Sequence, residues 1–171
     1  MAKPVMISVL ECDNHIDPDR SKWGGYGPLV SKWLRSNDRL QELAQIRVWD
    51  VKNAMDYPEP GDYDVLIITG APANPEGEEP WLVKLREYIE KEVETASHQK
   101  FVGFCFGHQI LAMAYGLSVE CNDSGSKIKT WDNSIISARR IILAYKVSFF
   151  LNAFGRSKRT PNLTLKHWAK Y

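Results

Sequence analysis

The chain has 171 residues, of which 44% are hydrophobic and 25% are charged. This length and composition favour one globular domain with a single core, and they exclude a large multidomain protein and a wholly disordered or fibrous chain. The formal net charge is only +1, from 22 basic and 21 acidic side chains.

The charges are unevenly distributed along the chain. Residues 1–124 carry 12 basic and 20 acidic side chains, whereas residues 125–171 carry 10 basic side chains and a single acidic one, Asp132. The net charge of −8 in the first segment is followed by +9 in the second. This division predicts an acidic domain over 1–124 and a basic tail of different character over 125–171.

Three cysteines, Cys12, Cys105 and Cys121, have spacings that match neither a disulfide framework nor a zinc site. We therefore expect no metal, no cofactor and a reducing compartment, the cytosol. The apolar run at 5–10 is too short for the core of a signal peptide, and the apolar stretch at 135–154 is interrupted by basic residues. No membrane segment is predicted.

The first half of the chain alternates strand and helix patterns. A charge-free run at 5–10 predicts a first strand, and a glycine-rich loop at 23–27 leads to helical spacing of apolar residues over 29–44. Residues 46–51 predict a second strand. Residues 64–69 form a nearly continuous apolar run, which is typical of a strand covered on both faces.

The alternation continues as far as about residue 122. Residues 81–93 have the spacing of an amphipathic helix, 101–104 predict a short buried strand, and the helical pattern at 110–116 ends at a glycine. Such an order predicts an α/β fold with a doubly wound, mostly parallel sheet and helices on both faces. Residues 123–126 are predicted to be a linker, and no clean period of 2 or 3.6 follows them.

Cys105 stands between the predicted strand and helix, with Gly103 and Gly107 two residues to either side. Glycines at these positions are typical of a sharp strand-to-helix turn, where the central residue is strained and neighbouring backbones approach closely. The thiol is then presented at the carboxyl edge of the sheet, where ligands bind open α/β folds. The following helix should lower the thiol pKa. The pattern predicts a nucleophile, and the alternative is an inert buried thiol.

Other groups are expected to surround this thiol. Gln109 lies one helical turn beyond Cys105 and can hydrogen-bond whatever the sulfur attacks. The backbone N–H of Phe106 would point toward a developing oxyanion. A second donor would come from the backbone at Gly70 and Ala71, which end the neighbouring strand.

Four motifs carry a resemblance to a known family: Gly103-Phe-Cys-Phe-Gly-His-Gln109, Ile68-Thr-Gly-Ala-Pro72, Pro80-Trp81 and Leu10-Glu-Cys-Asp13. Over residues 5 to about 122 the chain resembles the class I glutamine amidotransferases, and within them the stand-alone GMP-synthase-like group of fungi and plants. The resemblance implies a flavodoxin-like sheet. In that family the cysteine attacks the side-chain amide of glutamine, forms a γ-glutamyl thioester and releases ammonia.

Roles for individual residues follow from the resemblance. It implies that Cys105 is the nucleophile and that Gln109 contacts the substrate. It also implies that the Phe106 N–H and the backbone of Gly70 and Ala71 form the oxyanion hole. Glutamine is then the small-molecule substrate, and a synthetase partner of unknown identity would receive the ammonia.

The chain departs from the family after residue 124. The family completes a catalytic triad with a His-x-Glu motif farther along the chain, but the 66 residues after Cys105 contain none. His167 is the sole histidine there apart from His108, for which we expect a helix-surface role. His15 and His98 are expected in loops, exposed to solvent. The chain is therefore expected to be truncated or altered at its C-terminus, without the family's last strands or catalytic base.

Two explanations for residues 125–171 stay open. The segment is either the product of a retained intron, a frameshift or a mistaken gene model, or it is a genuine basic tail. Its basic residues are scattered among apolar ones without a recognisable nucleic-acid-binding motif, so we do not expect a nucleic-acid partner.

Three functions also stay open. The first is a glutaminase half-reaction that is impaired because the His-x-Glu part of the triad is absent. The second is a non-catalytic protein that binds glutamine or regulates a partner. The third is another cysteine hydrolase on the same type of sheet, such as the intracellular-protease-like family, in which Glu11 at the end of the first strand would tune the thiol.

Overall fold

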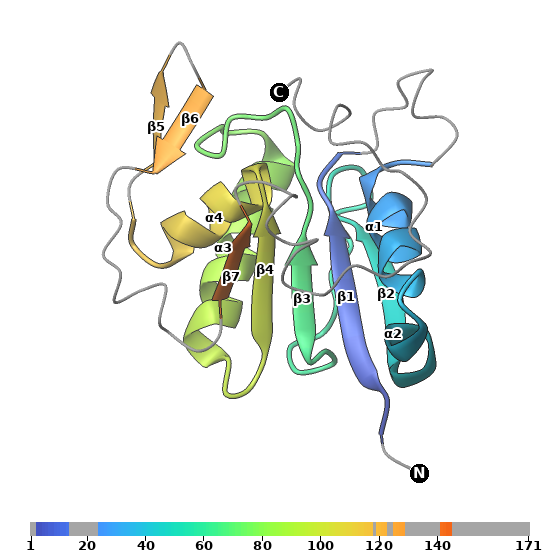
Figure 1. Cartoon of the computed structure of the whole chain (residues 1–171). Helices are drawn as coiled ribbons and strands as arrows, with labels where there is room; N and C mark the ends of the chain where they lie inside the picture. The colour runs from blue at the N-terminus through green and yellow to red at the C-terminus, as the bar shows by residue number, and fades with distance from the viewer. Residues whose placement is uncertain (1–2, 14–23, 118, 123–124, 129–140, 145–171) are drawn as a thin grey trace.

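The computed structural model describes residues 3–13, 24–117, 119–122, 125–128 and 141–144. A parallel sheet forms the centre of this part of the chain (Figure 1). Its strands are β1 (Val5–Glu11), β2 (Ala44–Asp50), β3 (Val65–Ile68), β4 (Lys100–Phe104) and β7 (Ile141–Ala144), and their order across the sheet is β2-β1-β3-β4-β7. The chain therefore starts near the middle of the sheet and winds outward in both directions.

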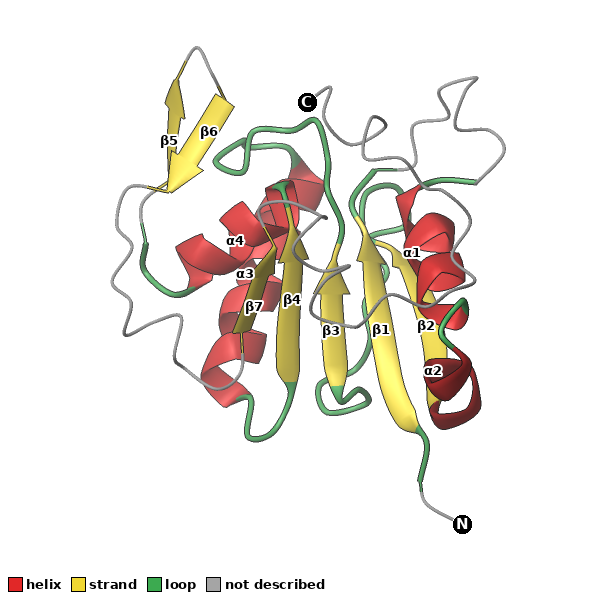
Figure 2. Cartoon of the chain, viewed as in Figure 1, coloured by secondary structure: helices red, strands yellow, loops and turns green. Residues whose placement is uncertain are grey.

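Helices cover both faces of this sheet (Figure 2). On one face, α1 (Tyr26–Arg35) packs its buried residues against β1 and the strands beside it. On the other face, α3 (Pro80–Thr95) and α4 (Phe106–Ala114) share a second cluster with the sheet. The predicted flavodoxin-like α/β fold is confirmed. None of the helices that the structure describes is both long enough and apolar enough to cross a membrane.

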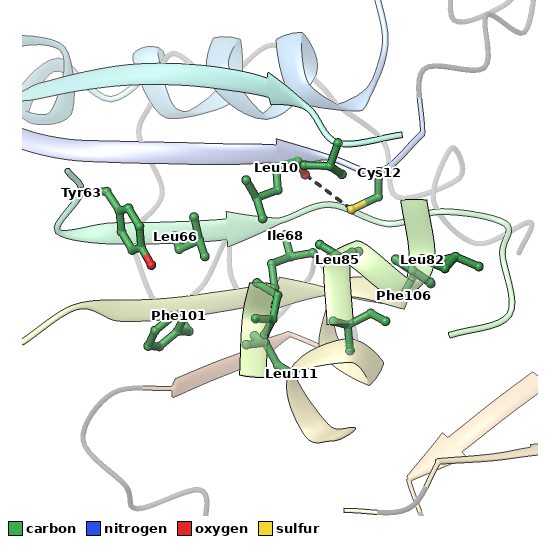
Figure 3. Packing of buried hydrophobic residues seen from close by; sticks show 13 residues of the cluster. Leu10, Cys12, Tyr63, Leu66, Ile68, Leu82, Leu85, Phe101, Phe106 and Leu111 are labelled. Carbon is green, nitrogen blue, oxygen red and sulfur yellow. Dashed lines mark hydrogen bonds between the residues drawn. The ribbon is translucent and has the colours of Figure 1, made fainter. Parts of the chain in front are cut away.

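The core under α3 and α4 is built from alternate residues of the inner strands. Successive side chains of a strand point to opposite faces, so Leu66 and Ile68 of β3 face the same layer. Figure 3 shows these two side chains among Leu82 and Leu85 of α3 and Leu111 of α4, all fully buried. Burial of each such side chain contributes about 1.5–3 kcal/mol. This layer fixes α4, and therefore the turn before it, against the end of the sheet.

The helical pattern predicted over 29–44 is divided into two helices. After α1, the side chain of Asn37 accepts a hydrogen bond from the N–H of Leu40 at 3.3 Å and caps α2 (Asp38–Leu43). Ala44, predicted to end the helix, is the first residue of β2. The helical prediction was wrong at this point because an asparagine cap restarts a helix and because Ala44 is compatible with either structure.

The C-terminal part of the described chain contains strands where no regular pattern was expected. Strands β5 (Val119–Asn122) and β6 (Gly125–Ile128) form a separate antiparallel pair, and β6 occupies part of the predicted linker. Strand β7 extends the main sheet beside β4. Its sequence, Ile-Ile-Leu-Ala, is a continuous apolar run whose periodicity cannot distinguish strand from helix. The division of the chain at residue 124 stays a prediction.

Candidate nucleophilic site

Cys105 connects β4 directly to α4 with an unusual backbone conformation. Its φ of 49° and ψ of −105° lie outside the regions that L residues ordinarily adopt, and the thiol is exposed to solvent. A strained residue of this kind persists only where the surrounding structure enforces it, and such residues cluster at functional sites. The predicted sharp turn is confirmed, and the alternative of a thiol buried in the core is wrong.

The two glycines beside Cys105 allow this turn to pack closely. A Cβ atom on Gly103 would lie 2.5 Å from the carbonyl oxygen of Gly107. A Cβ atom on Gly107 would lie 2.8 Å from the carbonyl carbon of Ile68 and still closer to its oxygen. Both contacts are with backbone, which cannot move aside as a flexible side chain can. The expected close approach of α4 to the ends of β3 and β4 is confirmed.

The surroundings of Cys105 raise the pKa of its thiol. Desolvation by the surrounding residues favours the neutral thiol and raises the pKa. The backbone N–H of Phe106 lowers the pKa by a smaller amount. Our expectation that the end of α4 lowers the pKa was therefore wrong in direction. The reason is that the packing of the turn removes more solvent from the sulfur than one N–H can replace. At neutral pH the thiol is mainly protonated and needs a base to become a strong nucleophile.

The loop that follows β3 lies against the thiol turn. A Cβ atom on Gly70 would be 3.7 Å from the Cβ of Cys105 and 3.7 Å from the carbonyl oxygen of Phe104. Thr69 fixes the start of this loop: its Oγ1 accepts a hydrogen bond from the N–H of Cys12 at 2.9 Å and donates one to the carbonyl of Gly70 at 3.4 Å. The backbone of Gly70 is therefore next to Cys105, where a donor to an oxyanion would have to be.

The remaining predicted site residues lie in the loop after β3 and in α4. Ala71 is partly buried against the core cluster beneath the loop. Phe106 is the first residue of α4, directly after Cys105, and its ring is buried (Figure 3). Gln109 donates its backbone N–H to the carbonyl of Cys105 at 3.2 Å, which places it one turn along the helix, and its side chain is partly exposed. The structure thus places Gly70 and Phe106 beside Cys105, with Ala71 following Gly70 along the chain and Gln109 one turn along α4, and the roles of all four stay predictions.

The described residues include two histidines, His98 and His108. His108 is buried rather than on the helix surface, which corrects our expectation, and desolvation lowers its pKa to about 4. An imidazole with this pKa is too weak a base for a thiol. His98 is exposed in a loop, as expected, and precedes β4, whereas Cys105 follows that strand. His15 and His167 lie outside the described residues.

Glu11 is engaged on the α1 side of the sheet. Its Oε1 accepts a hydrogen bond from the N–H of Gly27, in the first turn of α1, at 2.9 Å. Desolvation raises the pKa of Glu11, and the hydrogen bond from Gly27 partly offsets this. Strand β3 separates β1 from β4 in the sheet, so this contact gives no support to tuning of the Cys105 thiol by Glu11.

A series of side-chain contacts near the site was not predicted from the sequence. Asp13, which is 2% exposed, forms an ion pair with Lys52 at 3.1 Å. The same Lys52 Nζ lies 5.9 Å from the ring centroid of Trp81, whose ring is 5.9 Å from that of Phe106. These contacts join the end of β1 to Phe106, the residue after Cys105. A single lysine in a loop carries no sequence signal for such a contact. Within the described residues, no His, Cys, Asp or Glu side chains are grouped as metal ligands would be.

Comparisons with known proteins identify glutamine amidotransferases and related proteins. Residues 33–156 match the family described as glutamine amidotransferase class-I. A glutamine amidotransferase-like protein of Schizosaccharomyces pombe is 30% identical over 131 residues, which cover 72% of this chain and 53% of that protein. Gamma-glutamyl peptidase 3 of Arabidopsis thaliana is 36% identical over 73 residues, which cover 40% of this chain and 28% of that protein.

The chain spans about half the length of the first curated relatives that it matches, or less. Its fold is similar to the crystal structure of a glutamine amidotransferase from Thermotoga maritima, with a TM-score of 0.52 and 19% sequence identity. That similarity covers 72% of this chain and 48% of the other. At this identity the comparison shows the fold alone.

Proposed function

Because the chain belongs to the class I glutamine amidotransferase family, we propose that Cys105 attacks the γ-carboxamide of glutamine. The sulfur forms a bond to the γ-carbonyl carbon, the C–N bond breaks, and the amide nitrogen leaves as ammonia with the proton of the thiol. The product is a γ-glutamyl thioester on Cys105. The observation that carries this proposal is the exposed thiol at a strained, glycine-flanked turn that opens α4.

The groups around the thiol have distinct roles in this step. Attack on the amide carbonyl moves negative charge onto its oxygen, and backbone donors held in place stabilise that charge. The N–H of Phe106 and the backbone of Gly70 and Ala71 would form this oxyanion hole, since both segments border Cys105. Gln109, one turn along α4, would hold the substrate amide in line with the sulfur.

Turnover by this 171-residue chain should be impaired. No His-x-Glu follows Cys105 in it, and the raised pKa of the thiol leaves little thiolate at neutral pH. Loss of general acid–base catalysis costs about 10²–10⁴-fold. Both halves of the reaction are affected, because the leaving ammonia must gain a proton and the water that hydrolyses the thioester must lose one. Acylation is then slow, and release of glutamate is slow as well.

Hydroxylamine separates these two halves. It is a stronger nucleophile than water and converts a γ-glutamyl thioester to γ-glutamyl hydroxamate without help from a base. We expect the full chain to produce hydroxamate from glutamine faster than it produces glutamate, and free imidazole to raise both rates. The Cys105→Ala variant should produce neither. Equal hydroxamate from wild type and Cys105→Ala would contradict the proposal.

A second candidate function is glutamine binding without chemistry. It is favoured by one observation: the thiol has a raised pKa, and desolvation lowers the pKa of the nearby helix residue His108 to about 4. Calorimetry decides between the two, because heat of binding without hydroxamate or ammonia would identify a binding protein. Since one relative is named as a gamma-glutamyl peptidase, γ-glutamyl peptides, which share the acyl group of glutamine, belong in the same titrations.

The wider setting of this reaction is part of the proposal. A synthetase partner would consume the ammonia, as amidotransferases deliver it to a second active site. A cytosolic location is supported by Cys12 and Cys105, which are both free thiols.

A further inference from the structure

The loop between β3 and α3 is held at its middle by one side chain of α3. Residues 70–79 of this loop start with Gly70, which borders Cys105, and Ala71 follows it along the chain. Arg86, on the second turn of α3, directs Nη1 at the loop. That nitrogen donates to the carbonyl of Pro75 at 2.8 Å and to the carbonyl of Gly77 at 2.7 Å. Hydrogen bonds from a charged donor are about twice as strong as neutral ones.

The loop itself is compact around this contact. Asn74 accepts hydrogen bonds from the N–H of Glu76 at its Oδ1, at 3.1 Å, and from the N–H of Gly77 at its carbonyl, at 3.0 Å. Ala71 and Ala73 pack against the core cluster, so the first part of the loop rests on the protein. The carbonyls of Pro75 and Gly77 stay available beyond this turn, and the guanidinium of Arg86 satisfies both. The loop is therefore attached at β3, at α3 and at Arg86.

We infer that Arg86 is a positioning residue for the oxyanion hole: by holding the Pro75 and Gly77 carbonyls, it fixes the Gly70–Ala71 backbone beside Cys105. This inference rests on the proposed function, since it assumes that Gly70 and Ala71 act in the reaction. The hydrogen bonds of Arg86 are with loop carbonyls, so it would act on the reaction only through the loop. Its effect is mechanical, because a donor displaced by about 1 Å can lose on the order of 10²-fold in rate.

The same helix offers a matched control. Lys84, two residues earlier, donates its Nζ to the carbonyl of Met55 at 2.8 Å, in the loop that follows β2. Lys84→Met therefore removes a cation and a loop carbonyl contact from α3 but leaves the 70–79 loop intact. Arg86→Met removes the two contacts of interest. Arg86→Lys keeps the charge and can restore part of them with a shorter side chain.

The test uses two reagents on the full chain. A chloromethyl ketone analogue of glutamine should bind with its ketone oxygen in the oxyanion hole, where hydrogen bonds polarise the carbonyl and activate the adjacent methylene carbon. The sulfur of Cys105 then bonds to that carbon, chloride leaves, and the thiol proton passes to solvent. Chloroacetone undergoes the same reaction without the amino-acid part. Labelling of Cys105 is followed by peptide mass spectrometry, over a range of reagent concentrations, so that the limiting rate and the half-saturating concentration are obtained separately.

For wild type, we expect the analogue to label Cys105 much faster than chloroacetone does. Arg86→Met should lower the limiting rate for the analogue by about 10-fold or more. Its half-saturating concentration and its rate with chloroacetone should change by less than about 2-fold. The limiting rate of Arg86→Lys with the analogue should fall between those of wild type and Arg86→Met. Lys84→Met should label at the wild-type rate.

The possible failures are distinguishable. If the analogue labels wild type no faster than chloroacetone, the proposed function fails and this inference fails with it. If wild type prefers the analogue and Arg86→Met keeps the full limiting rate, only the role of Arg86 is overturned. A parallel fall with both reagents would show a general structural effect and would also overturn it. If Arg86→Met does not unfold cooperatively on heating, it is not folded, and Arg86→Lys then takes its place. A limiting rate of Arg86→Lys equal to that of wild type would overturn the role of Arg86.

Discussion

A Cβ atom on Gly70 would lie 3.7 Å from the Cβ of Cys105, so the loop after β3 and the turn after β4 are in contact. The register of the sheet produces this neighbourhood: Ile68 pairs with Gly103 in the parallel ladder, and each of the two residues in contact lies two positions further on. Neighbouring parallel strands thus deliver a thiol and a possible oxyanion donor to one edge of the sheet. The proposed reaction takes place at that edge.

The two glycines near this edge should respond differently to alanine. Gly107→Ala places a Cβ against the backbone of Ile68, and we expect it to lower the free energy of unfolding by at least about 2 kcal/mol. The gain in helix propensity, about 1 kcal/mol, does not offset this. Gly70→Ala makes only ordinary contacts and should change stability by less than about 1 kcal/mol. Urea denaturation measures both, and equal losses would contradict the packing described for the turn.

The pH dependence of alkylation tests the state of the thiol. Iodoacetamide reacts with thiolate, so a raised pKa predicts a rate at Cys105 that keeps increasing about tenfold per pH unit through pH 8. Cys12 serves as an internal reference, because it is fully buried and desolvation raises its pKa to about 12. It should stay unmodified in the folded protein. A rate at Cys105 that levels off below pH 7 would contradict the raised pKa and would show that the N-terminus of α4 lowers the pKa of the thiol.

A buried polar pair beneath α3 should be important for stability. The hydroxyl of Tyr63 donates to Oε2 of Glu92, and the two residues are 1% and 3% exposed. Desolvation raises the pKa of Tyr63, which keeps its phenol protonated and able to donate. Tyr63→Phe leaves a buried carboxyl group without this donor and should cost about 2–3 kcal/mol.

A double-mutant cycle supplies the control for this pair. Tyr63→Phe combined with Glu92→Met removes both polar groups, so the combined loss of stability should be smaller than the sum of the two single losses. Thermal or urea unfolding of the four proteins gives the coupling. Losses that simply add would mean that the two side chains do not depend on each other.

Sequence reasoning predicted the turn at Cys105 because its causes are local. Glycines at 103 and 107, an apolar run before them and a helical pattern after them together leave one conformation open to the chain. The strands at Val5–Glu11 and Lys100–Phe104 were predicted to within one residue at each end for a related reason. Each is a short apolar run with polar residues at one end, and each strand extends beyond the run by one such residue, Glu11 or Lys100.

The features that could not be predicted depend on contacts between distant segments. The pKa of Cys105 is set by how much solvent the folded chain removes, and a sequence window contains no measure of this. The ion pair of Asp13 with Lys52 joins two loops that become neighbours only when β1 and β2 pair. Strand β7 is identified by its pairing with β4, since four apolar residues carry no period of their own.

Acylation of Cys105 by glutamine tests the central claim most directly. The full chain is mixed with glutamine, the reaction is stopped with acid, which preserves a thioester, and the intact mass is measured over time, with Cys105→Ala treated in parallel. We predict a mass increase of one γ-glutamyl group in the wild-type chain, located at Cys105 by peptide mapping and removed by hydroxylamine, and none in the variant. A wild-type chain that binds glutamine but never gains this mass, or a variant that gains it equally, would contradict the account.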